Sequence, residues 1–193
     1  MSFNVLVIPE DFTKDEPILG PLVERILEEC GRKPTVEVCR DPNFQGVHAA
    51  LKLDSLRQDV IPLYPMVHLF VLIVDRDGQP GRKQRTDEIE TTLSAELKPM
   101  GKRFLAEVAW QEAEVFILAG LELPPDWKWN EIRADADVKD TFFKRLVALR
   151  GTSKYPHEGR KKLMAESIKN WRRIKGRCPE DVGALITRGS QVV

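Results

Sequence analysis

Two aspartates one residue apart, Asp75 and Asp77, directly follow the most apolar stretch of the sequence, VHLFVLIV at residues 67–74. The packing of a hydrophobic core does not require such an ending. Carboxylates on alternate residues of an extended chain point the same way and lie about 6.6 Å apart, so these two can address one centre while Arg76 points elsewhere. Asp-x-Asp-Gly is also a common turn sequence. Two interpretations therefore stand at this point, a carboxylate site and an ordinary turn.

A second pair of acids follows another expected strand. The run FNVLVI, residues 3–8, is apolar on both faces, as central strands of a parallel sheet are, and Glu10 and Asp11 come just after it. If the two strands are neighbours, three or four carboxylates meet at the rim where open α/β sheets bind their ligands. Two ionised carboxylates about 5 Å apart repel by roughly 3 kcal/mol at an effective dielectric constant of 20. A cation, shared protons or exposure to water must offset that repulsion, and oxygen ligands of this kind suit Mg²⁺ or Mn²⁺.

A third acidic position follows the next expected strand. Glu112 and Glu114 open a predicted helix at residues 111–120. They could complete a second metal site, because two ions about 3.5–4 Å apart would clamp the attacking and leaving oxygens of a phosphodiester. The alternative is that both are acids in the first turn of a helix, where the helix dipole favours them by about 0.3–1 kcal/mol.

The elements that must position these acids alternate between strand and helix over the first part of the chain. Strands are expected at residues 3–8, 35–39, 68–74 and 103–109, and helices between them at 17–30, at 46–57 and from Thr86 onward. Such alternation predicts an α/β fold in which helices flank a central, mostly parallel sheet. We therefore expect an α/β core over residues 1–122. Residues 123–193 are expected to form an irregular segment and then two helices, at 137–149 and 158–174, that pack on the core.

The last of these helices is strongly basic. Between Arg150 and Arg177 the chain has ten lysines and arginines against two acids, although it has 30 residues of each sign overall. Such a stripe could follow the phosphate backbone of a nucleic acid. The basic residues expected to do so are Arg160, Lys161, Lys162, Lys169, Arg172 and Arg173. Docking on an acidic surface and simple solvation remain open as alternatives.

Composition excludes several classes of protein. A hydrophobic content of 42% with 31% charged residues predicts a globular protein with a real core. The opening MSFNVLVIPED resembles no signal peptide, and no apolar run approaches the roughly 20 residues of a membrane span. The three cysteines have no Cys-x-x-Cys spacing, so we expect free thiols in a reducing cytoplasm. No phosphate-binding Gly-x-x-x-x-Gly-Lys-Ser/Thr motif occurs, so any dependence on ATP would come from a partner.

The acids after the first and third strands resemble those of the Toprim fold. That family, which includes topoisomerases, bacterial primases and OLD-type nucleases, holds Mg²⁺ with a glutamate after its first strand and an Asp-x-Asp after its third. By this resemblance Glu10, in VIPEDFTKDEP, corresponds to the glutamate, and Asp75 and Asp77, in LIVDRDG, to the Asp-x-Asp. Glu10 would orient a water, act as a general base or bind the metal, and the two aspartates would bind the metal.

A narrower resemblance covers nearly the whole chain. Small bacterial Toprim-like proteins of unknown function have a Glu-Ala-Trp-Leu-Leu-Ala-Asp helix and a basic C-terminal part with a Cys-Pro. The segment EVFILAG at residues 114–120 and Cys178-Pro179 are similar to these features, with Phe116 and Gly120 in place of Trp and Asp. Some members are encoded beside SMC/ABC-type ATPases and are suspected of acting in phage defence. The resemblance adds Glu114 to the expected metal ligands.

Two functions follow as expectations. The first is a cytoplasmic, Mg²⁺-dependent nuclease that works with an ATPase partner, with self-association left open. The second is a Toprim-like subunit that binds an ATPase without hydrolysing nucleic acid, because Asp11 stands where the family usually has glycine. Haloacid-dehalogenase phosphatases and response-regulator receivers fit less well. The former have Asp-x-Asp-Gly after the first strand, and here Lys98-Pro99, which a receiver would have after a strand, ends a predicted helix.

Overall fold

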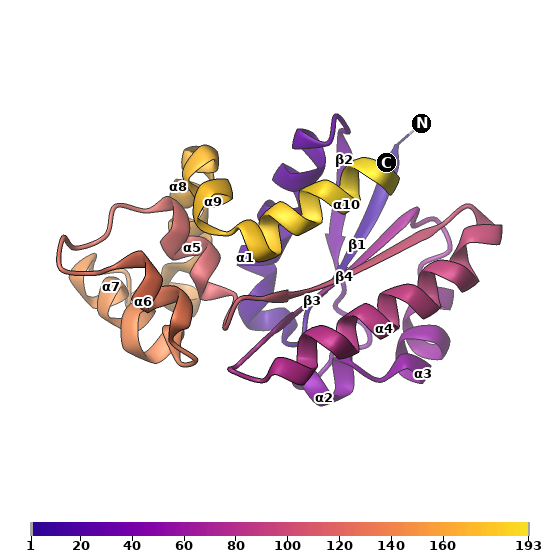
Figure 1. Cartoon of the computed structure of the whole chain (residues 1–193), viewed down its shortest axis with the longest axis horizontal. Helices are drawn as coiled ribbons and strands as arrows, with labels where there is room; N and C mark the ends of the chain where they lie inside the picture. Colours follow the sequence, from indigo (N-terminus) through magenta and orange to yellow (C-terminus); the bar gives the residue numbers. More distant parts are fainter. Residues whose placement is uncertain (1, 193) are drawn as a thin grey trace.

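The computed structural model describes residues 2–192 and contains a four-stranded sheet (Figure 1). The strands lie in the order β2–β1–β3–β4, and all three neighbouring pairs are parallel. Their bounds are β1 (Phe3–Ile8), β2 (Pro34–Val38), β3 (Leu69–Asp75) and β4 (Arg103–Ala109). The prediction of an α/β fold around a parallel sheet is therefore confirmed.

Helices cover both faces of the sheet because side chains alternate along each strand. Val5 and Val7 of β1 belong to one hydrophobic cluster, whereas Leu6 and Ile8 belong to another on the opposite face. The helices on the first face include α1 (Phe12–Glu29), α5 (Glu114–Gly120) and α10 (Ala184–Val192). Those on the second face are α2 (Val47–Ala50), α3 (Leu53–Ser55) and α4 (Pro80–Leu97).

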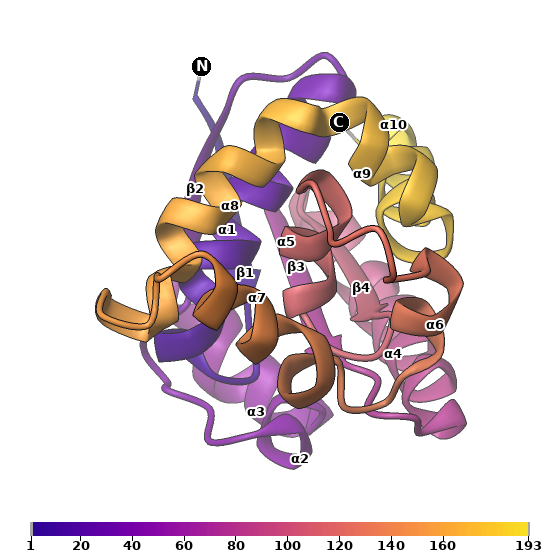
Figure 2. The same ribbon diagram turned by 90° about the vertical axis from the view of Figure 1, so that its left-hand side faces the viewer.

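The C-terminal part of the chain packs on the first face of the sheet (Figure 2). Its other helices are α6 (Trp129–Ala134), α7 (Lys144–Leu149), α8 (Arg160–Ser167) and α9 (Trp171–Arg177). α8 contacts both α1 and α5, and α9 also contacts α5. Phe143, Met164 and Trp171 are buried in the same cluster as Val5 and Val7, so both parts of the chain share one core. Among the described residues, no helix combines the length and apolar character of a membrane span.

Several predicted helix boundaries are wrong, and each error has a local cause. α1 begins at Phe12 rather than Pro17, because the Asp11 side chain accepts hydrogen bonds from the backbone N–H groups of Thr13 and Lys14, at 3.0 and 3.3 Å. α4 begins at Pro80 rather than near Thr86, since proline suits the first position of a helix.

The C-terminal helices also differ from expectation. The single helix predicted over 158–174 is two helices, α8 and α9, separated by a tight turn at Ile168–Asn170. Asn170 leaves helical geometry there, with φ −97° and ψ 44°, and its side-chain amide donates to the carbonyl of Gly120 at 2.8 Å. α10, which returns to the sheet and contacts β4, was not predicted.

Side chains bind several backbone groups along the open edge of β4. Glu90 accepts from the Ala106 N–H at 2.6 Å, and Arg188 donates to the Ala106 carbonyl at 3.2 Å. Ser94 donates to the Phe104 carbonyl at 2.8 Å. Farther along the strand, carboxylates of Glu107 and Asp181 accept from the N–H groups of Val108 and Trp110. Edge groups that would otherwise be free to pair are thus occupied.

Gly120 sits where two helices come into close contact. Gly120 is the last residue of α5, and its backbone lies against α8. A Cβ at this position would lie 2.8 Å from the carbonyl carbon of Ser167, and closer still to two of its oxygens. Ser167 in turn donates to the Phe116 carbonyl at 3.0 Å. Glycine is needed here because it lets α5 and α8 approach.

Replacing Gly120 with alanine should therefore force α8 away from α5. We expect Gly120→Ala to lower the free energy of unfolding by about 1–3 kcal/mol or more, as overpacking does. Gly176→Ala is the matched control, because nothing lies within 4 Å of a Cβ added there, and we expect it to be neutral or to stabilise by about 0.4–1 kcal/mol. Urea denaturation measures both, and equal stability of the two variants would contradict the close contact.

Candidate metal centre

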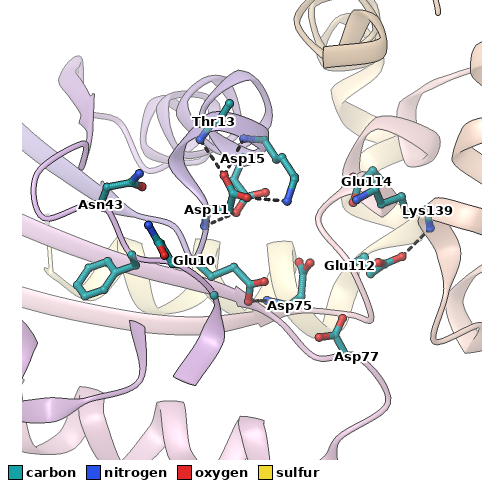
Figure 3. A pocket seen from close by; sticks show the side chains of 14 residues that line it. Glu10, Asp11, Thr13, Asp15, Asn43, Asp75, Asp77, Glu112, Glu114 and Lys139 are labelled. Carbon is teal, nitrogen blue, oxygen red and sulfur yellow. Dashed lines mark hydrogen bonds and ion pairs between the residues drawn. The ribbon is translucent and has the colours of Figure 1, made fainter. Parts of the chain in front are cut away.

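A pocket of about 610 Å³ opens at the carboxyl end of the sheet (Figure 3). It lies between the start of α1, the segment 43–46 and the loop after β4. Seven carboxylates and two lysines line it, so the charges around it are unbalanced. The charged residues of this acidic pocket are Glu10, Asp11, Lys14, Asp15, Asp75, Asp77, Glu112, Glu114 and Lys139.

The strand order explains why these acids meet. β3 lies between β1 and β4, so the tips of three adjacent strands converge at one rim. Glu10 follows β1, Asp75 ends β3, and Glu112 follows β4. The Glu10 carboxylate accepts a hydrogen bond from the Asp75 backbone N–H at 3.2 Å. The acids after the first and third strands therefore do come together, as the sequence predicted.

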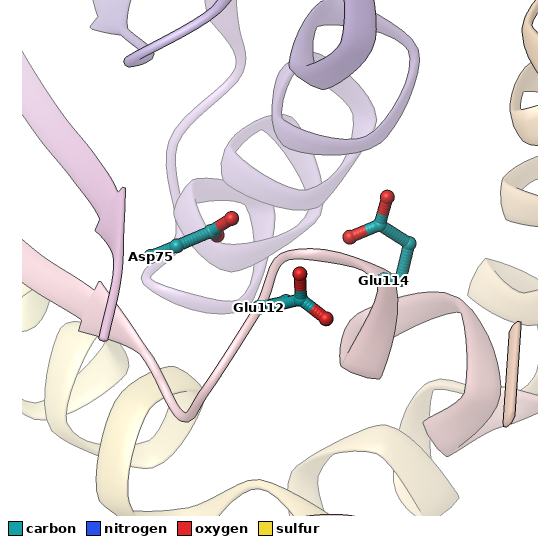
Figure 4. Close-up of side chains that lie close together, drawn as sticks. All are labelled: Asp75, Glu112 and Glu114. Carbon is teal, nitrogen blue, oxygen red and sulfur yellow. The ribbon is translucent and has the colours of Figure 1, made fainter. Parts of the chain in front are cut away.

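Three of the carboxylates form a compact group that could hold a metal ion (Figure 4). One oxygen from each of Asp75, Glu112 and Glu114 lies within 4.8 Å of the others. We call these residues the carboxylate triad. Figure 4 shows that they come from different places, Asp75 from the end of β3, Glu112 from the loop and Glu114 from the start of α5, and that their carboxylates face a common space.

Each member of the carboxylate triad is held through one oxygen. Asp75 Oδ1 accepts from the Ala113 N–H at 2.8 Å, and Glu112 Oε2 accepts from the Lys139 N–H at 2.6 Å. Glu114 Oε1 accepts from Arg160 at 2.6 Å. Within residues 2–192 the second oxygen of each carboxylate has no hydrogen-bond donor. Three fixed carboxylates thus keep one oxygen each for a ligand.

The acidic pocket disfavours ionised carboxylates. Burial raises the pKa of Asp75 well above its usual value, and the neighbouring Glu10 raises it further. Burial also raises the pKa of Glu112 to about 7, and that of Asp15, on the first turn of α1, to about 7. The pKa of Glu10 is raised for the same reason. A divalent cation would relieve this shared repulsion by supplying positive charge where the acids converge.

Asp77 does not join the carboxylate triad, contrary to the sequence prediction. The expectation assumed an extended chain through residue 77, but β3 ends at Asp75 and Asp77 has a φ of +46°. Its carboxylate forms an ion pair with Arg82 instead. The backbone N–H groups of Arg76 and Asp77 both donate to the Gln111 carbonyl, at 2.8 and 2.9 Å. The Asp-x-Asp-Gly segment is therefore a turn as well as the source of one triad acid.

Arg76 points away from the acids, as expected. Its guanidinium lies 3.8 Å from the centre of the Trp110 ring. Such stacking is attractive because the ring face is negative.

Arg160 does not belong to the exposed basic surface, which corrects the sequence prediction. It is only 3% exposed, and its guanidinium bridges Glu114 and Glu158, at 2.6 and 2.9 Å. The same guanidinium lies 5.0 Å from the centre of the Phe143 ring. A buried, paired arginine cannot contact a nucleic acid in this conformation. Its contact is with the carboxylate triad instead.

The other predicted nucleic-acid residues remain accessible to different degrees. Lys161 and Lys162 are exposed on α8, and the Lys162 amine lies 5.0 Å from the centre of the Tyr155 ring. Lys169 and Arg172 are exposed near the break between α8 and α9. Arg173 is half-buried and forms an ion pair with Glu122. Four of the six predicted basic residues are thus exposed.

Sequence reasoning did not identify every residue of the acidic pocket. Glu112 was an expected candidate for a second site, but the structure places it in the same group as Asp75. Asp15 is an acid near the start of a helix, where acids commonly act as caps. Its burial depends on how α1 packs beside the acidic pocket, which no sequence motif indicates. Lys139 comes from a helical turn in the C-terminal part, far along the chain. Only tertiary structure brings it to the loop after β4.

Comparisons of the chain with models of protein families, with curated proteins and with solved structures found no significant match. The fold and the acidic pocket define an α/β protein with a group of carboxylates that could hold a metal ion. Any more specific function is proposed from this geometry and from the sequence resemblance.

Burial of Asp15 should make stability depend on pH. Between about pH 4 and pH 7 the folded chain keeps the Asp15 proton while the unfolded chain releases it, so the free energy of unfolding falls as pH rises. Asp15→Asn removes this titration, and we expect its stability relative to wild type to rise between pH 5 and pH 8 by at least about 1.4 kcal/mol, one pKa unit. Thermal unfolding at several pH values measures the difference.

Asp59→Asn is the control for this prediction, since Asp59 is an exposed aspartate. Its stability relative to wild type should stay nearly constant over the same range. Parallel pH profiles for wild type and Asp15→Asn would show that Asp15 ionises as freely in the folded chain as in the unfolded one.

Metal binding should separate the carboxylate triad from the ligand set predicted by the sequence. We expect Asp75→Asn and Glu112→Gln each to weaken Mn²⁺ binding by about tenfold or more. Mutation of a residue that only hydrogen-bonds to a metal ligand already lowers metal affinity by about that factor, and these two residues would be ligands themselves. Asp77→Asn, which removes an equal charge from the same pocket, should have a much smaller effect. Titration calorimetry or the electron paramagnetic resonance of Mn²⁺ measures all three. An equal loss for Asp77→Asn would restore the Asp-x-Asp pair as the ligands.

Proposed function

We propose that the chain is a Toprim-like nuclease that uses Mg²⁺ or Mn²⁺ to hydrolyse phosphodiester bonds in DNA or RNA. The observation that supports this proposal best is the carboxylate triad at the carboxyl rim of a parallel sheet, with Glu10 beside it. The type of reaction, hydrolysis of phosphodiester bonds, is proposed from the resemblance of VIPEDFTKDEP and LIVDRDG to Toprim motifs.

The donor set fits a hard divalent cation. The triad offers only carboxylate oxygens, which suit Mg²⁺ and Mn²⁺, and Mg²⁺ commonly takes one or two carboxylates and keeps several waters. Asp75, Glu112 and Glu114 would hold the ion through their free oxygens. When bound, such an ion polarises a phosphoryl oxygen and lowers the pKa of a water.

Glu10 is the candidate for the general base in this proposal. Its carboxylate is anchored to the Asp75 N–H, so it is fixed beside the triad without being part of it. Burial raises its pKa, which brings a glutamate closer to the range in which it can accept a proton at neutral pH. We assign Glu10 the task of orienting a water and taking its proton.

Nucleic acid and a partner ATPase complete the proposal. The exposed cations of α8, of α9 and of the turn between them, Lys161, Lys162, Lys169 and Arg172, can contact backbone phosphates. The sequence has no phosphate-binding loop of its own, so an SMC/ABC-type ATPase would supply any coupling to ATP. The narrower sequence resemblance supports a role as an effector in bacterial phage defence, and the cysteines without Cys-x-x-Cys spacing favour the cytoplasm.

A second candidate function is a catalytically silent subunit of an ATPase complex. One structural feature favours it: arginines already neutralise two of the predicted ligands, Arg160 on Glu114 and Arg82 on Asp77. In that case arginines would balance the charge of these acids, and the acidic pocket would have only a structural role. The surface of the protein would then bind the ATPase partner.

Cleavage assays distinguish the two candidates. Purified protein would be incubated with plasmid, single-stranded DNA and tRNA in the presence of Mg²⁺ or Mn²⁺, with and without the partner ATPase. The nuclease proposal expects cleavage that Asp75→Asn and Glu112→Gln reduce to background, because each removes a triad oxygen ligand. Asp77→Asn serves as the control with the same charge change and should retain most activity.

Equal cleavage by wild type and Asp75→Asn would end the nuclease proposal. Cleavage of no substrate under any condition, together with intact binding of the ATPase by Asp75→Asn, would support the silent subunit instead.

A further inference from the structure

A second charged cavity lies away from the acidic pocket. It has a volume of about 710 Å³ and lies between the last turns of α1 and the residues at the break between α8 and α9. Five cationic side chains and one carboxylate line it. The charged residues of this basic hollow are Arg25, Glu29, Lys169, Arg172, Arg173 and Lys175.

The one carboxylate cannot balance the cations around it. Glu29 already accepts from the Trp171 indole at 3.1 Å and forms ion pairs with Lys175 and, at 3.8 Å, with Arg25. Within residues 2–192, Lys169 and Arg172 have no ion-pair partner, and both side chains are exposed. Arg25 and Arg173 also pair with Glu28 and Glu122, which lie outside the lining. The excess positive charge of the basic hollow is therefore that of Lys169 and Arg172, and an anion would relieve the repulsion among its cations.

The basic hollow is linked to the acidic pocket by two helices. The first turn of α1 lies beside the acidic pocket at Asp15, and the helix reaches the basic hollow at Arg25 and Glu29, a span of about 15–20 Å at 1.5 Å per residue. α8 makes the same connection, because it begins at Arg160, in contact with Glu114, and leads to Lys169. The spacing between the two sites is thus fixed by rigid elements.

We propose that the basic hollow binds backbone phosphates of the same nucleic acid whose phosphodiester bond enters the acidic pocket. The inference rests on the proposed function for its substrate class and adds a second contact point. Along duplex DNA, about 15–20 Å corresponds to about four to six base pairs. The nucleic acid is thereby anchored by phosphates several nucleotides from the bond that reacts.

Charge complementarity favours phosphate over other occupants of the basic hollow. Guanidinium groups bind phosphate through paired N–H donors, and the Arg172 guanidinium, which lines the cavity, forms no ion pair with any residue of 2–192. The repulsive acidic pocket cannot itself attract a polyanion, so a distant cationic site is needed to retain one. The basic hollow meets that need without placing positive charge on the triad.

The test is the affinity of a labelled 12-base-pair duplex, measured by fluorescence anisotropy on the full chain in EDTA, so that no cleavage occurs. Lys169→Glu/Arg172→Glu reverses the two unpaired cations. We expect it to weaken binding by about tenfold or more and to reduce the slope of log K against log salt by about 1.8, the loss of two phosphate contacts.

Lys52→Glu/Lys98→Glu is the matched control, since both lysines are exposed on the other side of the sheet and the change in net charge is the same. It should alter the affinity less than twofold if local contacts, and not overall charge, determine binding. Urea denaturation confirms that both double variants are folded.

Equal affinities for wild type and Lys169→Glu/Arg172→Glu would overturn the inference, and so would an equal loss for the two double variants. Unchanged duplex affinity would also be the result if the hollow takes only free inorganic phosphate or an acidic protein. Because this assay needs no catalysis, the phosphate anchor can pass it even if the cleavage assays above show no nuclease.

Discussion

The buried ion pair between Glu114 and Arg160 determines how the two parts of this chain fit together. Glu114 is the first residue of α5 and Arg160 the first residue of α8, and both are almost excluded from water, at 5% and 3% exposure. Removing water from a charge costs several kcal/mol unless an opposite charge compensates, and loss of one partner from such a pair typically costs 3–5 kcal/mol. The register of α8 on α5 is therefore set at this point. The same ion pair fixes the direction of the Glu114 carboxylate, which faces Asp75.

The other two acids of the carboxylate triad are also each held by one donor, but this donor is a neutral backbone amide. Parallel strands bring the acids to one rim, and each acid of the triad is then held by a single donor that leaves its second oxygen free. Donors come from the Ala113 and Lys139 amides and from Arg160, so two of the three belong to the C-terminal part. Residues that come late in the sequence thus orient carboxylates that the strands of the sheet bring together. The strand ends alone would therefore not fix the orientation of the carboxylates in the acidic pocket.

The sequence predicted the parts of this architecture that depend on local patterns. Apolar or alternating runs located all four strands, and the acids after two of them predicted the meeting of Glu10 with Asp75, because strand period and strand-end chemistry are local properties. The sequence prediction failed where the backbone conformation changes from one residue to the next. The left-handed conformation of Asp77 breaks the alternation that would have aimed it at the triad. Arg160 was assigned to the surface because its helix is basic, and only its tertiary contact with Glu114 shows that it is buried.

The side chains along the open edge of β4 also constrain assembly. An additional strand could pair there only by displacing Arg188 and Glu90 from Ala106, and by breaking the contacts of Glu107 and Asp181 with the same edge. Each displaced charge would need a new partner in a site with little water. Growth of the sheet from this side, whether by a second copy or by a misfolded chain, is therefore opposed by electrostatics. A larger assembly would have to form through helices or through the β2 side.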